Sequence, residues 1–461
     1  MKLKRELNFF DMTNIVIGSI VGSDIYIVAA ITAGLIGPFS ILVWVAAAVA
    51  STILALVFAY SSYYVPKVGG SFAFVSTAFD KFYGFLAGWS LWIAEIICLP
   101  VAAIIFTNYL QYFIPLSFVQ QILVKAVFLF GLTAINIAGV KIAGKVNDAL
   151  TLVKLSPLLL LIVAGLLTFA YNPSILSNYS PFAPLGLQNF GTALVLIFWA
   201  YAGFELGPLP ASEVKHPKKT IPKAIIAGMA IVTFFYVAVN FVAYGTVNWQ
   251  QLATSSVPLV LVGSVLMGSI GAIIMTFGAL ASVSGVDESG ILGTSRLSYA
   301  MSIDGLFPKI FSKVHSKYKT PYMSLLIQGA IAFILSIFSG IRGLISFSVF
   351  NLAFSFLLTC FALVILTKGK EKELHGQKIL PWLGIAICLY LLYSTSTFDK
   401  IVGAGLILLG IPFYVFFSPK VDMYHLKKMF LSEEAIFERK LERKEKFLAN
   451  FVRMMHKLFK E

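Results

Sequence analysis

The sequence carries little charge for its length. Of its 461 residues, 12% are Asp, Glu, Lys or Arg, against about 25% in a typical soluble domain. By contrast, 59% are hydrophobic and 14% are aromatic. This composition excludes a soluble enzyme of this length, and it excludes a disordered chain because so much apolar surface must be buried. It predicts an all-α integral membrane protein.

Cysteine is also scarce, and the motifs of several other protein classes are missing. Cys98, Cys360 and Cys388 lie inside apolar runs, so we expect free thiols and no disulfide framework. No G-x-x-x-x-G-K-[ST] loop occurs, which argues against an ATP-driven pump, and the five histidines show no metal-ligand spacing. We therefore expect a protein that is not an enzyme, needs no metal or other cofactor and does not bind nucleic acid.

Long apolar runs occupy most of the chain. A membrane helix needs about 20 apolar residues, so twelve helices would use roughly 240 residues and leave short loops and a tail. We expect twelve transmembrane helices, at roughly 9–35, 38–65, 82–113, 122–140, 146–171, 190–212, 222–246, 260–302, 321–339, 343–366, 379–395 and 400–418. The first run has no cleavage-like end, so we interpret it as a membrane helix and not as a signal peptide.

The segments between these runs alternate in charge. Five of them together hold sixteen lysines, at positions 67, 81, 141, 145, 215, 218, 219, 223, 309, 313, 317, 319, 368, 370, 372 and 378. The segments 111–121, 172–189 and 245–258 hold no Lys or Arg, and the other turns of that set offer Arg342 and Lys400. Because basic loops stay in the cytoplasm, the pattern predicts a multi-pass cell (plasma) membrane protein with both termini cytoplasmic.

Residues 420–461 differ from the rest in mixing Lys, Arg and Glu with regularly spaced apolar residues. Two interpretations are open for this cytoplasmic tail. It is an amphipathic helix lying on anionic lipid, or it is a solvated charged segment.

Two runs contain helix-breaking residues. They are 18–26 (GSIVGSDIY) in the first run and 198–210 (FWAYAGFELGPLP) in the sixth. Glycine weakens a helix and proline removes a backbone donor, although both also serve packing in membranes. Interrupted helices that open two successive blocks of five are the best sequence indicator of a transporter site. Freed N–H groups favour a carboxylate and freed carbonyls favour a cation, so the pattern suits a small zwitterion.

The same segments resemble the amino acid–polyamine–organocation (APC) transporter superfamily. Residues 18–26 correspond to its first-helix pattern G-x-I-[IV]-G-[SA]-G-I-[FY], with Asp24 in place of a glycine. Residues 203–205 correspond to its sixth-helix G-[FV]-E. Further motifs match at 216–224 (HPKKTIPKA), 295–300 (SRLSYA), 304–308 (DGLFP) and 320–321 (TP). The motifs keep the family's order over roughly residues 10–420, and the chain is similar to prokaryotic proton-coupled amino acid permeases.

The resemblance implies a five-plus-five inverted-repeat (LeuT-like) core with broken helices 1 and 6 and two additional helices. The implied units are a cytoplasmic N-terminus 1–8, a first repeat 9–171, an extracellular loop 172–189, a second repeat 190–366, helices 11–12 within 367–419 and the tail 420–461. It also implies substrate-binding positions around the two breaks. These are Ile20, Gly22, Ser23, Asp24, Ile25, Trp199, Ala202 and Gly203, with Trp199 at the place of a gating aromatic or as plain packing.

Lys154 is the most conspicuous buried cation, because a charge at membrane depth is costly and indicates function by default. It follows Lys145 by nine residues, roughly 13 Å along a helix, beyond easy reach of the cytoplasm. Proton-coupled family members carry a lysine here, near the first break and the eighth helix, where sodium-coupled relatives bind sodium. The resemblance implies H⁺ as the coupling ion in preference to Na⁺. The alternative is a fixed charge paired with a carboxylate. Candidate site-facing residues on the eighth helix are Ser282, Ser284 and Asp287.

Several intramembrane carboxylates complicate this interpretation. Asp24 departs from the family, and three roles are open: it pairs with Lys154, it binds the amine of a cationic substrate, or it titrates and couples transport to protons. Glu205 is either a proton-sensitive gate residue or an acceptor for freed backbone N–H groups. Asp287 and Glu288 are adjacent and face different sides of a helix, so at most one faces the solute path. Glu95 carries the least information.

We therefore predict a proton-coupled amino acid permease that works by alternating access in the lipid bilayer. A carrier or exchanger of cationic amino acids or polyamines that uses Asp24 as the amine receptor is the first alternative. A channel is the alternative from another class. The exact substrate, symport or exchange, the oligomeric state, the host and the use of the glycosylation sequon at Asn178 are left open by the sequence.

Overall fold

The computed structural model describes residues 8–67, 69–138, 140–208, 214–369, 374 and 376–417, with the backbone alone for 140–152. These residues form helices joined by turns, and no strand occurs among them. The N-terminal basic residues and the predicted tail at 420–461 lie outside the described residues.

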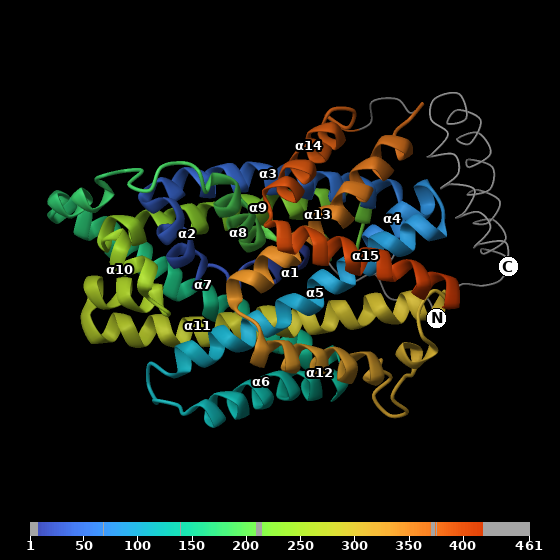
Figure 1. The fold of residues 1–461 in the computed structure, drawn as a ribbon, viewed down its shortest axis with the longest axis horizontal. Helices are drawn as coiled ribbons and strands as arrows, with labels where there is room; N and C mark the ends of the chain where they lie inside the picture. The colour runs from blue at the N-terminus through green and yellow to red at the C-terminus, as the bar shows by residue number, and fades with distance from the viewer. Residues whose placement is uncertain are drawn as a thin grey trace, which may run out of the picture.

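Helices follow the predicted apolar runs closely (Figure 1). The elements are α1 (Phe9–Ile20), α2 (Val28–Ile36), η1 (Gly37–Phe39), α3 (Ser40–Tyr64), α4 (Ser71–Ala78), α5 (Lys81–Leu110), α6 (Phe118–Ala138), α7 (Val140–Tyr171), η2 (Pro173–Tyr179), α8 (Phe190–Tyr201), η3 (Phe204–Leu206), α9 (Pro217–Thr246), α10 (Trp249–Thr254), α11 (Pro258–Ile303), η5 (Lys309–Ser312), α12 (Tyr322–Phe338), α13 (Ile341–Leu366), α14 (Leu380–Ser394) and α15 (Thr397–Phe417). Sequence reasoning missed α4 and α10, which are short helices in connecting segments.

Eight helices in the described part of the chain are long and apolar enough to cross a membrane. Four shorter apolar helices accompany them: Phe9–Ile20, Phe190–Leu206, Tyr322–Phe338 and Leu380–Ser394. One long candidate, Val28–Tyr64, joins α2 to α3 through the single 3₁₀ turn η1. Apolar helices of this length identify an integral membrane protein.

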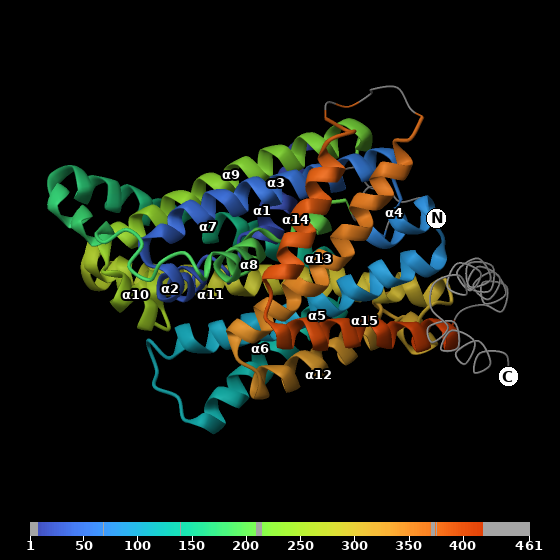
Figure 2. The same cartoon turned by 45° about the horizontal axis from the view of Figure 1, so that its top comes forward.

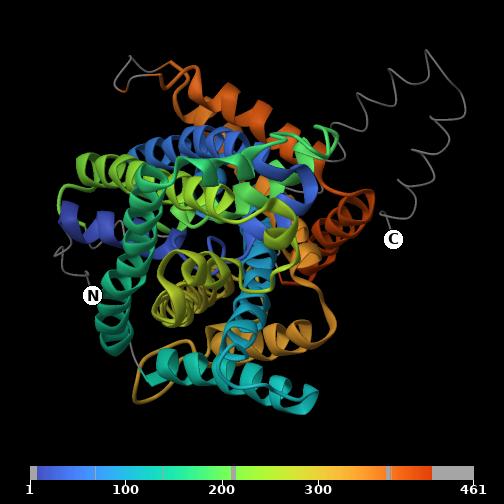
Figure 3. The ribbon, with the colours of Figure 1, turned by 90° about the vertical axis from the view of Figure 1, so that its left-hand side faces the viewer.

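The long helices run roughly along one axis of the molecule (Figures 1 and 2). α3 packs against α9, α5 packs against α11 and α13, and α7 packs against α11. α6 and α12 pack together on one flank, as the view along the long axis also shows (Figure 3). The short helices α1 and α8 lie among these long ones, in contact with α9 and α3 respectively.

Both predicted interruptions are present. α1 ends at Ile20 with Val21 in an extended conformation, and the helix resumes as α2 at Val28. α8 ends at Tyr201, Ala202 is extended, and Gly203 has a φ of +121° before the 3₁₀ turn η3. A φ in that region favours glycine. A Cβ at Gly203 would lie 2.3 Å from the Ser19 carbonyl oxygen, so the two interrupted segments pass very close to each other.

α11 differs from the single straight span predicted at 260–302. It contains a non-helical residue, Gly268, with a φ of 64° and a ψ of −152°. The helix is therefore kinked near its N-terminal end. The part that follows the kink reaches the two interruptions and delivers Ser282 and Asp287 to them.

Candidate functional site

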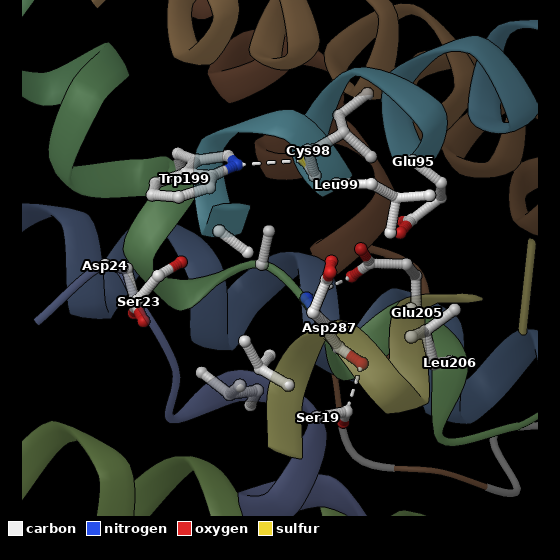
Figure 4. Close-up of a pocket in the computed structure, with 17 residues that line it drawn as sticks. Ser19, Ser23, Asp24, Glu95, Cys98, Leu99, Trp199, Glu205, Leu206 and Asp287 are labelled. Carbon is white, nitrogen blue, oxygen red and sulfur yellow. Dashed lines mark hydrogen bonds between the residues drawn. The ribbon is translucent and has the colours of Figure 1, made fainter. Parts of the chain in front are cut away.

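The two interrupted segments meet at Ser19 and Gly203. The Ser19 hydroxyl donates to the Gly203 carbonyl at 3.1 Å and to the Val16 carbonyl at 3.1 Å (Figure 4). α11 joins them from a third side, because the Ser282 hydroxyl donates to the Gly22 carbonyl at 3.3 Å. The breaks in α1 and α8 thus form one site, although Ser19 and Gly203 are 184 residues apart in the chain.

Each break binds its freed amide with a carboxylate of its own. The Gly22 N–H donates to Asp24 Oδ1 at 2.9 Å, and the Gly203 N–H donates to Glu205 Oε2 at 2.9 Å. In both cases a glycine amide reaches the acidic side chain two residues further on. A buried amide without a partner costs about as much as a lost hydrogen bond, so these carboxylates stabilise the unwound backbone.

Asp24 is 4% exposed and is held from a second side by α9. The Tyr236 hydroxyl donates to Asp24 Oδ2, and it also lies 3.1 Å from the Ile20 carbonyl oxygen. Tyr236 is fixed by edge-to-face packing on Trp44 and by contact with Tyr201, with ring centroids 5.6 and 5.2 Å away. Sequence reasoning missed Tyr236, because a tyrosine in an apolar run carries no signal of its own.

Lys154 is fully buried, and its ammonium donates to the Gly18 carbonyl at 2.7 Å. Gly18 lies in the last turn of α1, where carbonyls have no partner within the helix. A cation there also complements the negative end of the helix dipole. Asp24 accepts from the Gly22 amide and the Tyr236 hydroxyl, so its charge and that of Lys154 interact at longer range and not through a shared hydrogen bond.

A cavity of about 70 Å³ lies between the breaks, α5 and α11. Its lining consists of Ser19, Ile20, Ser23, Asp24, Glu95, Cys98, Leu99, Ala102, Trp199, Ala202, Gly203, Glu205, Leu206, Val286, Asp287, Gly290 and Leu352. Small-molecule sites usually measure about 300–1,000 Å³. The described conformation therefore encloses little space, and the site has to widen to admit a solute.

Most of the predicted site residues line this cavity. Those that do are Ile20, Ser23, Asp24, Trp199, Ala202, Gly203, Glu205 and Asp287. Gly22, Ile25, Lys154 and Ser282 belong to the surrounding break structure instead. Ser284 donates to the Leu280 carbonyl of its own helix at 2.7 Å and is not part of the lining.

α5 contributes Glu95 and Cys98 to the cavity lining, and the sequence alone indicated no specific function for either. Glu95 is 8% exposed and borders both this cavity and a smaller one that it shares with Glu205, Leu206 and residues of α11. Cys98 accepts the indole N–H of Trp199 at 3.1 Å, which fixes the orientation of that ring. In the sequence, the indication that α5 belongs to the site was the carboxylate of Glu95 within an apolar run. Only the tertiary structure shows which groups this carboxylate lies beside.

Figure 4 shows the charged groups of the cavity at two separate places. Glu95, Glu205 and Asp287 are grouped together, whereas Ser23 and Asp24 lie away from them below Trp199. One oxygen of Asp287, Oδ2, has no hydrogen-bond partner although the side chain is 3% exposed. Within the described residues, no group of three or more His, Cys, Asp or Glu side chains is placed to hold a metal ion.

An all-helical membrane protein with a largely apolar cavity that carries a few acidic side chains between two interrupted helices has the architecture of a membrane transporter. The chain matches the amino acid permease family over residues 7–417, which is most of its length. It belongs to that family.

Curated relatives of similar length support this assignment. The branched-chain amino acid permease BcaP of Bacillus subtilis (strain 168) is 28% identical over 442 residues, covering 91% of this chain and 94% of the relative. The serine/threonine exchanger SteT of the same organism is 28% identical over 435 residues, covering 89% and 96%. The methylthioribose transporter of that organism is also 28% identical, over 425 residues covering 85% and 88%.

Proposed function

We propose that this chain is a secondary active transporter that moves amino acids across the membrane by alternating access. One observation carries the proposal: the cavity lined by both interrupted helices, in a chain of the amino acid permease family. Two of the similar proteins named above are an amino acid permease and an amino acid exchanger. The small volume of the cavity is consistent with a cycle in which the site opens and closes.

The proposed architecture is twelve transmembrane helices, with two inverted repeats of five followed by two more. The interruptions support it, because they fall in the first helix of each block of five, at α1/α2 and at α8/η3. The substrate positions would be Ile20, Gly22, Ser23, Asp24, Ile25, Trp199, Ala202 and Gly203. Among them, backbone groups of the breaks and the ring of Trp199 would contact the solute.

The proposed coupling ion is H⁺, exchanged through Lys154 with Asp24 and Glu205 as acidic partners. The ammonium of Lys154 lies at the carbonyl end of α1, where freed backbone oxygens would otherwise attract a metal cation such as Na⁺. Burial disfavours the charged form of a lysine, so a change in its surroundings during the cycle would load or release a proton.

The test is uptake into proteoliposomes of the purified chain, with and without an imposed proton gradient. We expect saturable uptake of at least one amino acid, stimulated by an inward proton gradient, together with counterflow when the vesicles are preloaded. Counterflow distinguishes a carrier from a channel. Uptake that does not saturate and shows no counterflow would contradict the proposal and support a channel.

A further inference from the structure

The geometry points to a binding site for an anionic phospholipid on another face of α5 than the one that borders the breaks. One acyl chain lies in a second cavity between α5, α12, α13 and α15, and the phosphate lies against Arg342 and Lys400. This site is separate from the proposed substrate site, so the inference holds whichever solute is transported.

The first observation is the cavity itself, which lies where α5 packs against α12, α13 and α15. Its volume is about 540 Å³, against about 70 Å³ for the cavity between the breaks. Apart from the indole of Trp92, its polar side chains are Ser339 and Asp399, and the rest of the lining is aliphatic, aromatic or glycine. A cavity of this size and composition suits the hydrocarbon part of an amphiphile.

α5 separates this second cavity from the one between the breaks. Glu95, Cys98 and Leu99 line the cavity between the breaks, whereas Ile93 and Ile97 line the second one. The two sets lie on different faces of the same helix. A lipid in the second cavity therefore contacts the helix that forms a wall of the proposed substrate site, without entering that site.

The second observation is that the polar side chains lie at one end of the cavity. Ser339 directly follows α12, and Asp399 lies in the first turn of α15. From there the lining continues to Ile331 in α12 and to Leu406 in α15, roughly 10–12 Å away at the rise of an α-helix. One leaflet of the bilayer core is about 15 Å thick, half of the whole. The cavity thus fits an amphiphile whose chain extends from the helix ends into one leaflet.

Exposed apolar side chains surround this polar end. Phe338 of α12 is 83% exposed, and Phe398 and Ile401 of α15 are 73% and 68% exposed. In a helical membrane protein, apolar side chains with this exposure mark contact with the membrane. The cavity therefore opens toward the hydrocarbon of the bilayer, from which a lipid chain can enter it.

The third observation is the charge beside the opening, which selects the headgroup. Arg342 lies in the first turn of α13 and is exposed, and Lys400 directly follows the lining residue Asp399. Three other segments of the set to which their turns belong hold no Lys or Arg. The two basic residues of that set thus border one cavity. An anionic phosphate is the partner that both can bind.

Asp399 does not exclude an anion at this place. It is 7% exposed, and its Oδ2 accepts from the hydroxyls of Ser346 and Ser396 at 2.5 and 2.7 Å. The ammonium of Lys400 lies 5.2 Å from the centroid of the Tyr393 ring, a contact that orients the side chain and leaves N–H donors for a phosphate. Two accessible cations therefore stand against one buried carboxylate that its own chain already holds.

The test is lipid binding to the purified full chain in detergent, measured by tryptophan fluorescence. Phosphatidylglycerol and phosphatidylcholine are compared with the same brominated acyl chains, because bromine quenches an indole that it touches. Each basic residue at a membrane surface adds about fivefold for an anionic lipid, so we expect saturable quenching with at least tenfold tighter binding of phosphatidylglycerol. Quenching that does not saturate, or that is equal for both headgroups, would overturn the inference.

The position of the chain is tested through Trp92, which lines the cavity. In Trp92→Phe we expect the saturable part of the quenching to disappear. Trp382 in α14 is 59% exposed and continues to report lipid on the general surface of the protein. Saturable quenching that is unchanged in Trp92→Phe would place the bound lipid elsewhere and contradict the inference.

A second variant fills the cavity. A Cβ at Gly343 would meet no described atom within 4 Å, so Gly343→Leu has room to occupy the lining with its side chain. We expect it to weaken the binding of phosphatidylglycerol at least tenfold. The matched control is Gly131→Leu in α6, where a Cβ is equally unhindered and no part of this lining is changed. Equal binding by the two variants would show that the chain does not enter the cavity.

The headgroup is tested by removing the two charges and leaving the cavity intact. The double variant Arg342→Gln/Lys400→Gln should bind phosphatidylglycerol and phosphatidylcholine within about twofold of each other, because the anionic phosphate has lost its partners. Lys313→Gln is the control, since Lys313 is exposed and directly follows η5. A double variant that keeps the full preference would contradict the assignment of the phosphate. These measurements involve no transport, so their failure leaves the proposed function standing.

Discussion

At the scale of single residues, the site depends on where a few buried charges find partners. Asp24 and Glu205 each accept the amide N–H of a glycine two positions earlier. The two breaks therefore satisfy a freed backbone amide by the same local arrangement. Glu205 accepts the freed Gly203 amide, which is one of the two roles that the sequence left open for it. A function as a proton-sensitive gate remains compatible with that contact.

Lys154 yields a prediction at this scale. Replacing it with Met keeps most of the volume and removes the ammonium that donates to the Gly18 carbonyl. We expect substrate counterflow to persist. The proton gradient should no longer stimulate uptake, so that the ratio of uptake with and without the gradient is about one, because the proposed proton carrier is gone. The measurement is uptake with and without the gradient.

A half-buried lysine provides the control for that experiment. Lys125 in α6 donates to the Ser336 carbonyl at 2.8 Å and is not part of the cavity lining. Lys125→Met should keep its gradient stimulation. If Lys154→Met still responds to the gradient as the unsubstituted chain does, Lys154 does not couple transport to protons.

At the scale of elements, the two interruptions depend on a glycine at their crossing point, the place where Gly203 of the α8 break passes Ser19 of α1. Gly203 combines a φ of +121° with a backbone neighbour, the Ser19 carbonyl, that leaves no room for a Cβ. Gly22 is also crowded, but by the side chain of Val286, which has some freedom to move. The α8 break therefore has the stricter requirement of the two.

We expect Gly203→Ala to destabilise the protein by about 1–3 kcal/mol from backbone strain alone, with a further cost for the contact to Ser19. The physical consequence is a displaced α8 break and loss of the hydrogen bond between Ser19 and Gly203. The measurements are the thermal unfolding midpoint in detergent and uptake in proteoliposomes, and both should fall.

Gly131→Ala is the matched control, because a Cβ at this exposed position of α6 would meet nothing within 4 Å. It should unfold at the same temperature as the unsubstituted chain or slightly above it, since Ala favours a helix by up to about 1 kcal/mol. Equal stability and uptake of Gly203→Ala and Gly131→Ala would show that the crossing point tolerates a side chain.

At the scale of the whole molecule, the charge pattern of the sequence corresponds to two ends of the fold. One end of the long helices carries the α5–α6 loop, together with η2 and α10 (Figures 1 and 2). These three segments hold no Lys or Arg. α4 and η5, which belong to lysine-bearing segments, lie at the opposite end. By the positive-inside rule, the end with α4 and η5 is proposed to face the cytoplasm.

Cysteine labelling in cells tests this orientation. Tyr112 lies beyond the end of α5 and Ser316 lies between η5 and α12, and both are exposed. We expect a membrane-impermeant maleimide to label Tyr112→Cys in intact cells and Ser316→Cys only after permeabilisation. The unsubstituted chain serves as background control, because Cys360 and Cys388 are buried and Cys98 is half-buried. The reverse labelling pattern would invert the proposed topology.

Much of the fold could be predicted from the sequence because membrane helices are long and apolar along most of their length. A backbone without internal hydrogen bonds is too costly in lipid, so an apolar run of sufficient length forms a helix whatever its neighbours are. The breaks were also visible, since glycine, proline and acidic residues stand out in such runs. The kink at Gly268 and the short helices α4 and α10 were missed, because a single glycine and short amphiphilic segments are ambiguous locally.

The sequence by itself therefore determined the class of protein, the positions of the helices and the two interruptions. Only the tertiary structure decided which groups share the cavity, because those contacts join residues that are far apart in the chain. Tyr236 reaches Asp24 from α9, and Glu95 and Asp287 join Glu205 from α5 and α11. Long-range packing also directs Lys154 to the Gly18 carbonyl, a partner that no local pattern specifies. Periodicity shows which residues are buried, but the partner of a buried charge depends on how whole helices pack.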